Sequence, residues 1–344
     1  MITIDGGQGE AGGQILRTAI ALSAITKKHV KIVNIRKARC NPGLAQQHLM
    51  GVKIAGEFCN AKVAGLKIGS TEVEFSPSEI IYEDKKIDIG TAGSIALLLQ
   101  TLTPILIFTN KKITLDITGG TDVKWSPSML YYKHIFWEYL KMMGVSVDVD
   151  IVKYGFYPKG GGHVKVTFNP FKELKPVNLT DRGEFVRMDV WGVASEQLKK
   201  ANVVERMIES FEKNIGEKIT HRRIFYVESL STGCVLHAHA HYTNGKLGGT
   251  ALGELKKPAE KIGEEVAAEL KESMQSNAAV DKFMTDQLLP FMALANGKSS
   301  AKVEEVTDHC KTNISICEHL LGCKFVVDER EKIIEVEGVK SILY

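Results

Sequence analysis

Three features are missing from this 344-residue sequence, and each absence narrows what it can encode. No two of its six cysteines form a C-x-x-C pair, and no N-terminal stretch resembles a secretory signal. We therefore expect reduced thiols in a cytoplasmic protein. No long apolar run is visible, because the most apolar stretch, residues 95–108, contains Gln100 and Pro104 and is too short to cross a bilayer. We expect no membrane association.

A strong charge of either sign is also missing. The 44 Lys and Arg residues nearly balance the 41 Asp and Glu residues, so the net charge is only +3. A polyanionic partner would therefore have to be held by a local patch rather than by the field of the whole molecule. One segment has the necessary density of positive charge, although a solvated edge explains it equally well; it contains Lys27, Lys28, Lys31, Arg36, Lys37 and Arg39.

What is present is an ordinary globular composition with an internal repeat. Hydrophobic residues make up 44% and charged residues 25% of a chain long enough for two domains. Glycine-rich turns in residues 4–15 and 87–95, and a third turn before residue 287, each lead into an apolar helix. After each helix the pattern indicates a strand, a polar loop, an amphipathic helix and two further strands. We describe the unit as βααββ, and expect three of these α+β units to pack around a pseudo-threefold axis.

The third unit is interrupted by a segment with its own pattern of strand, helix, strand, strand and helix. We therefore predict a large domain of residues 1–180 and 278–344, with a smaller α+β domain inserted at residues 181–277. An insertion of this kind requires its two ends to lie close together.

His309 follows a predicted strand at residues 301–306 and lies in a predicted turn, with Thr312 or Asn313 as a suitable N-cap for the next helix. A histidine at a strand end beside Asp308 can have its imidazole oriented and its charge tuned, although most loop histidines are simply solvated. His309 is nevertheless the leading candidate for chemistry.

Polar residues also occur in two predicted helices. Gln14 and Arg17 lie three positions apart and therefore share one helix face. Arg17 stands in an otherwise apolar helix and requires a fixed anionic partner, either a structural carboxylate or a ligand. Gln47 and His48 lie near the start of a later helix, where a solvated surface is the simpler interpretation.

Three further patterns suggest other chemistry. Residues 7–12 match G-x-G-x-x-G, but the basic segment that follows is wrong for a dinucleotide-binding fold. Cys310 beside His309 is a poor dyad, because adjacent side chains in an extended turn point apart. His237, His239 and His241 alternate, so they would face one side of a strand. They could bind a metal, but we favour an exposed sheet face because no acidic partner is obvious.

Five segments together resemble the RNA 3′-terminal phosphate cyclases. They are residues 4–17 (IDGGQGEAGGQILR), 41–48 (NPGLAQQH), 90–94 (GTAGS), 155–162 (GFYPKGGG) and the segment around His309. The resemblance implies three units like the C-terminal domain of initiation factor three, with a smaller inserted domain. It also implies ATP-dependent conversion of an RNA 3′-phosphate to a 2′,3′-cyclic phosphodiester, with release of AMP and diphosphate.

The same resemblance implies roles for individual residues. His309 would attack ATP and carry AMP, and Glu10 would bind a metal ion, Mg²⁺ or Mn²⁺. Nucleotide-binding positions would be Glu10, Gln14, Gln100, Phe283, Met284, Thr285, Asp286 and Gln287. The substrate phosphate would be held by Arg17, Arg39, Gln47 and His48. RNA 3′-phosphate ends would be the partner, and a homodimer is common in the family.

Two rival functions remain at this point. Cyclase-like proteins that serve ribosomal RNA processing share the fold but lack the histidine, so His309 favours the enzyme over such an inactive factor. Enolpyruvyl transferases also use βααββ units, but they would require six units and no insertion, whereas three units are visible here.

Overall fold

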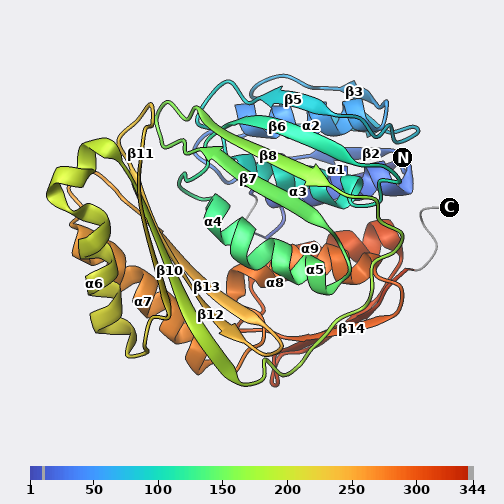
Figure 1. Ribbon diagram of the computed structural model, residues 1–344. Coiled ribbons are helices and arrows are strands. Elements are labelled where there is room, and N and C mark those ends of the chain that lie inside the picture. The colour runs from blue at the N-terminus through green and yellow to red at the C-terminus, as the bar shows by residue number, and fades with distance from the viewer. Residues whose placement is uncertain (10–11, 340–344) are drawn as a thin grey trace.

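The structure is a computed structural model that describes residues 1–9 and 12–339. These residues form four mixed sheets of four strands each, with helices packed on them (Figure 1). The α+β class is therefore confirmed. Within the described part of the chain, no helix has the length and apolar character needed to cross a membrane.

The first sheet sets a pattern of connections that recurs twice. Its spatial order is β1 (Ile2–Asp5), β2 (Val30–Val33), β4 (Val73–Ser76) and β3 (Lys62–Ala64). β1 pairs parallel with β2, whereas β4 pairs antiparallel with both β2 and β3. Helix α1 (Gln14–Thr26) connects β1 to β2, and α2 (Gln46–Phe58) connects β2 to β3.

Two other sheets repeat this order and these pairings. One contains β5 (Lys85–Asp88), β6 (Ile113–Gly119), β8 (Gly162–Phe168) and β7 (Val147–Lys153). The other contains β9 (Asn178–Leu179), β14 (Lys298–Lys302), β16 (Ile333–Glu337) and β15 (Phe325–Asp328). Each unit has the order βαβαββ, so the expected βααββ is one strand short: it omits the strand between the two helices.

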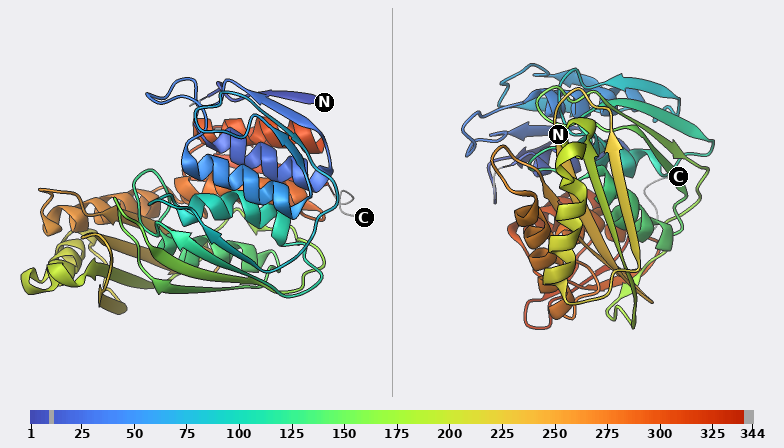
Figure 2. Two further views of the ribbon diagram at one scale, coloured as in Figure 1. Left: turned by 90° about the horizontal axis from the view of Figure 1, so that it is seen from above. Right: turned by 60° about the vertical axis from the view of Figure 1, so that its left-hand side comes forward.

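The helices of these units meet on the inner side of the sheets. The second unit supplies α3 (Ile95–Leu106) and a long second helix. This long helix consists of α4 (Met129–Tyr131), the π-helical turn η1 (Tyr132–Phe136) and α5 (Trp137–Met142). The third unit supplies α8 (Lys282–Leu294) and α9 (Asp308–Leu321). α1 packs against α2, α3 and α9, and α9 packs against α8 (Figures 1 and 2). One apolar core joins all three units. Polar residues on these helices are thereby brought together.

The start of α9 differs from the expectation. The predicted strand at residues 301–306 is β14 at Lys298–Lys302, and α9 begins at Asp308 rather than near Thr312. Thr307 is the N-cap, because its side chain accepts a hydrogen bond from the Cys310 backbone N–H. His309 therefore lies in the first turn of a helix and not in a loop.

The segment between β9 and α8 forms the fourth sheet and a lobe at one side of the molecule (Figures 1 and 2). Its strands, in spatial order, are β11 (His221–Val227), β10 (Phe185–Ser195), β12 (Cys234–Tyr242) and β13 (Lys246–Leu252). A 3₁₀ turn, η2 (Glu196–Ala201), precedes α6 (Val203–Ile215), and α6 and α7 (Ala259–Gln275) cover one face of the sheet around a separate apolar core. Both ends of the segment lie against β14: Leu179 pairs with Ala301, and Ala279 donates to Lys302.

Two expectations for this segment were wrong. β13 was not predicted, because Gly248 and Gly249 interrupt its apolar pattern; a Cβ atom on Gly248 would lie 2.9 Å from the Ile135 side chain, so glycine is required there. The face that carries His237, His239 and His241 is buried rather than exposed, with relative exposures of 0%, 2% and 7%. That face packs towards the long helix of the second unit.

Candidate active site

The first turn of α9 presents His309 at a helix N-terminus. The unpaired backbone N–H groups there carry the positive end of the helix dipole, which favours a bound anion. Cys310 is fully buried beside it, and burial raises the pKa of its thiol to about 12. The thiol is therefore protonated at neutral pH, which argues against cysteine chemistry.

Gln14, the first residue of α1, fixes the orientation of His309. Its side-chain carbonyl Oε1 accepts a hydrogen bond from His309 Nδ1, and its Nε2 donates to Asp286 Oδ2 at 2.5 Å. An amide oxygen only accepts hydrogen bonds, so Nδ1 of a neutral ring carries the hydrogen and the ring lone pair lies on Nε2. The side chain of Gln14 is buried, which fixes this bridge in place.

Arg17 lies one turn further along α1, where the charge of the Asp286 carboxylate favours its protonated form. Within residues 1–9 and 12–339 it forms no ion pair, and its buried Nε has no hydrogen-bond partner. Burial lowers the pKa of Arg17 to about 10, which still leaves the guanidinium protonated at neutral pH. The lowered pKa shows that Asp286 offsets only part of the cost of removing this cation from water, so its environment suits a bound anion.

His48 lies beside Arg17, in the first turn of α2. Its Nδ1 accepts a hydrogen bond of 3.3 Å from the Ala45 backbone N–H, so its Nε2 carries the hydrogen. Burial, together with the charges of Arg17 and Arg36, lowers the pKa of His48 to about 3. His48 is therefore a neutral hydrogen-bond donor. Its neighbour Gln47 accepts from the Ser94 backbone N–H at 3.3 Å, at the start of α3.

The first turns of α8 supply another part of the cluster. Gln100 of α3 donates to Gln287 Oε1 at 3.1 Å, and Asp286 accepts from Gln14. Phe283 is 44% exposed. Met284 and Thr285, by contrast, are buried, and Thr285 bonds to the backbone of its own helix. The structure therefore brings Asp286 and Gln287 to Gln14 and Gln100, and leaves Met284 and Thr285 in packing positions.

The glycine-rich turn before α1 contacts two other parts of the cluster. A Cβ atom on Gly12 would lie 3.1 Å from Arg39 Nη2, so the Arg39 guanidinium packs on this turn. Gly9 has a φ of 54°, and a Cβ atom there would lie 2.6 Å from Thr312 Oγ1 on α9. Both glycines permit close approach of neighbouring segments. Glu10, the predicted metal-binding residue, lies outside the described residues.

Two residues that the sequence did not identify as site residues belong to this cluster. Asn313 accepts from Thr18 Oγ1 at 2.7 Å and donates to the Asp286 carbonyl at 2.7 Å. It thereby ties α1 and α8 to α9. A signal was available, because Asn313 follows His309 by four positions and Thr18 follows Gln14 by four, and such pairs share a helix face.

The cluster is closely packed, and the cavity among these helices that includes Gln14 and Arg17 has a volume of only about 30 Å³. A much larger cleft, of about 790 Å³, lies between the second and fourth sheets and shares no lining residue with it. The convergence of polar side chains and helix N-termini, rather than cavity size, identifies the site.

Comparison with known proteins agrees with this arrangement. The family model described as RNA 3′-terminal phosphate cyclase matches residues 8–327. A protein of Caldivirga maquilingensis with that name is 43% identical over 98% of this chain and 97% of its own length. Relatives of the same name from Methanosarcina acetivorans and Archaeoglobus fulgidus are 42% and 41% identical, over 98% and 100% of this chain and 99% and 100% of their own lengths. The chain that carries the His309 cluster belongs to the RNA 3′-terminal phosphate cyclase family.

Proposed function

We propose that this protein converts the 3′-phosphate of RNA to a 2′,3′-cyclic phosphodiester, using ATP and releasing AMP and diphosphate. The observation that carries the proposal is the first turn of α9, where Gln14 accepts from His309 Nδ1 and directs the lone pair to Nε2. A nucleophilic imidazole needs one unprotonated nitrogen, held by a hydrogen bond at the other.

In the first step His309 Nε2 attacks the α-phosphorus of ATP. A P–N bond forms, the bond to the β-phosphate oxygen breaks, and diphosphate leaves. Gln100, Asp286 and Gln287 line one cavity with Gln14, the partner of this histidine. The exposed ring of Phe283 offers a surface on which adenine can stack. Met284 and Thr285 would act through the packing of α8.

In the second step AMP passes from His309 to an oxygen of the RNA 3′-phosphate, and the adjacent 2′-OH then attacks that phosphorus and expels AMP. Arg17 and Arg39 supply guanidinium groups for phosphate, and His48 supplies an N–H donor. Gln47 holds the start of α3 in place. The attack is intramolecular, so correct orientation alone contributes several kcal/mol, and no strong base is required.

A divalent ion, Mg²⁺ or Mn²⁺, is proposed to accompany ATP. Such ions prefer oxygen ligands and neutralise charge on transferring phosphates. No group of three metal-ligating side chains lies at His309 within the described residues. The nucleotide phosphates would therefore supply most ligands, and Glu10 is the proposed protein ligand.

The finer fold assignments are proposals too. We propose three units of the initiation-factor-three type around one core, supported by the identical strand order of three sheets. Residues 181–277 would form an inserted domain, which the separate apolar core of that segment supports. A cytoplasmic location and a homodimer are likewise proposed; light scattering after gel filtration measures the oligomeric state.

An inactive ribosomal RNA processing factor is the alternative, and one experiment separates the two. The protein is incubated with labelled ATP and Mg²⁺, then with RNA that ends in a 3′-phosphate. We expect acid-labile label on the protein, and then conversion of the RNA end to a phosphatase-resistant form. A protein that binds RNA but takes up no label is the processing factor.

Gln14→Met should slow self-adenylation by about 100-fold, because methionine keeps the volume of glutamine but cannot accept from His309 Nδ1. The rate of label transfer from ATP under single-turnover conditions measures the effect. Gln197→Met, in the exposed η2 turn, is the matched control. An unchanged rate in Gln14→Met would show that this hydrogen bond does not prepare the nucleophile.

A further inference from the structure

A second cluster of titratable side chains lies far along the chain from the His309 cluster, on the inner face of the fourth sheet. Asp189 on β10 pairs in register with His239 on β12, and His241 is two residues further along the same strand. Because side chains alternate along a strand, all three point to the same face. Each is at least nine-tenths buried, with exposures of 6%, 2% and 7% respectively.

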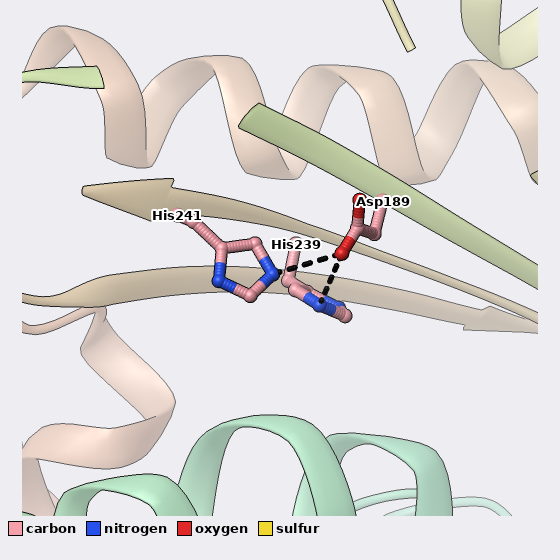
Figure 3. Close-up of side chains that lie close together, drawn as sticks. All are labelled: Asp189, His239 and His241. Atoms are coloured by element: carbon pink, nitrogen blue, oxygen red, sulfur yellow. Dashed lines mark hydrogen bonds and ion pairs between the residues drawn. The ribbon is translucent and has the colours of Figure 1, made fainter. Parts of the chain in front are cut away.

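The three side chains converge on one point, as Figure 3 shows. Asp189 Oδ2 lies 3.0 Å from His241 Nε2 and 3.7 Å from His239 Nε2. One ligand atom from each residue lies within 4.8 Å of the other two. Metal–ligand bonds of about 2.0–2.1 Å in a tetrahedral site place neighbouring ligands about 3.3 Å apart. The two measured distances bracket this value.

Outer hydrogen bonds hold the ligand atoms in place. His239 Nδ1 lies 3.1 Å from His237 Nε2, and His237 Nδ1 lies 2.9 Å from Thr250 Oγ1. On the other side, His221 Nδ1 lies 2.7 Å from Asp189 Oδ1, the carboxylate oxygen that points away from His239 and His241. Such partners, which fix ring orientation and tautomer, accompany most histidine ligands.

The contact between His239 and Asp189 is not a hydrogen bond, because 3.7 Å is too long. When His239 donates from Nδ1 to His237, its lone pair lies on Nε2 and faces a carboxylate oxygen. In this tautomer two buried acceptors face each other, and a cation between them would remove their repulsion.

One cation already approaches this oxygen. Arg187 Nε lies 3.0 Å from Asp189 Oδ2, but the Arg187 side chain is 39% exposed and can turn into solvent. The side chain of His239 cannot turn into solvent in this way, because it is buried. The ring of His134, from the π-helical turn η1, lies nearly parallel to the His239 ring, with 5.1 Å between the ring centroids, and covers it. The ring of His239 therefore lies between the fourth sheet and η1.

We propose that Asp189, His239 and His241 bind a divalent transition-metal ion, Zn²⁺ being the ion that the ligand set fits best. Two imidazole nitrogens and one carboxylate oxygen suit zinc, whereas Mg²⁺ prefers an all-oxygen site. Three protein ligands leave a coordination position for water. The ion would join β10 to β12 beneath η1, so this site is separate from the nucleotide chemistry at His309.

The test uses the full-length protein with any affinity tag removed. After treatment with a chelator the protein is titrated with Zn²⁺, and retained metal is measured by elemental analysis after gel filtration. We expect one tightly bound equivalent. Asp189→Asn and His239→Gln, which preserve side-chain size, should each bind Zn²⁺ at least about 100-fold more weakly. Circular dichroism establishes that both variants are folded.

Two control variants locate the ion. His29→Gln, before β2, should bind Zn²⁺ as tightly as the wild type, and so should His309→Ala. Co²⁺ in place of Zn²⁺ should give the strong visible absorption of a low-coordinate site, and Asp189→Asn should lose it. The proposal is overturned if the wild type retains no Zn²⁺, or if folded Asp189→Asn and His239→Gln proteins bind it with unchanged affinity.

Discussion

His309→Ala should abolish transfer of AMP to the protein while leaving the fold intact. The imidazole is the only group in the cluster whose lone pair is directed by Gln14, so its loss removes the route to a phosphoramidate. Thr307 still caps α9, and the truncated side chain is only partly buried, so the free energy of unfolding should fall by no more than about 1 kcal/mol. Mass spectrometry after incubation with ATP and Mg²⁺ measures the adduct.

Other histidines should not take over this role. His319 lies ten residues further along α9, about 15 Å along the helix axis, which makes His319→Ala the matched control. His48 presents an N–H rather than a lone pair to the cluster. On the wild type the adduct should map to the peptide that contains His309. An adduct that persists in His309→Ala, or that maps to a lysine, would refute the mechanism even if RNA cyclisation were observed.

Arg17→Met should lose activity and gain stability. The guanidinium has no salt bridge among the described residues, and although the Asp286 carboxylate favours its charged form, burial lowers its folded-state pKa to about 10, below the ordinary value of 12.5. A base whose folded pKa is lowered destabilises the fold at every pH where it stays charged, including pH 7. Replacement by an apolar side chain of similar length should therefore raise the melting temperature.

The loss of activity should fall on RNA rather than on ATP. We expect Arg17→Met to lower kcat/KM for 3′-phosphorylated RNA by 100-fold or more, where each factor of ten corresponds to roughly 1.4 kcal/mol. The rate of self-adenylation should fall by much less. Arg39→Ala should show the same selectivity with a smaller effect, because the Arg39 side chain is exposed. Arg330→Met, in the exposed turn before β16, is the control. If self-adenylation fell as far as cyclisation, both arginines would serve the nucleotide.

The sequence was informative where chemistry depends on residue type and spacing. His309 and Gln14 were identified as candidates from their patterns and Asp286 from the family resemblance, and the structure brings the three together. The prediction that His309 lies in a turn was wrong, because α9 begins at Asp308. Thr307 and Thr312 are equally suitable N-caps by residue type, and only the hydrogen bond from the Cys310 backbone N–H to Thr307 distinguishes them. For the same reason Asn313 was predicted as a possible N-cap, whereas it lies inside α9.

Burial was the property least accessible from sequence. The alternation of His237, His239 and His241 gave the strand and the shared face, but which face is covered depends on the long helix of another unit. Asp189 lies 50 residues before His239, so its place opposite that histidine depends on strand pairing. Likewise, the pair Gly248 and Gly249 is typical of a turn in the sequence. Only the structure shows that Ile135 packs against Gly248 within a strand.

The two-residue strand β9 has a consequence for synthesis of the chain on the ribosome. It pairs only with β14, about 120 residues later, so at 5–20 residues per second it waits roughly 6–24 s for its partner. The first two sheets draw all their strands from earlier residues and can close during this interval. The third sheet is therefore completed last, after the segment between β9 and α8 has emerged. Helix α9, which carries His309, is made after that segment, so the proposed nucleophile joins a cluster whose other helices have already been synthesised.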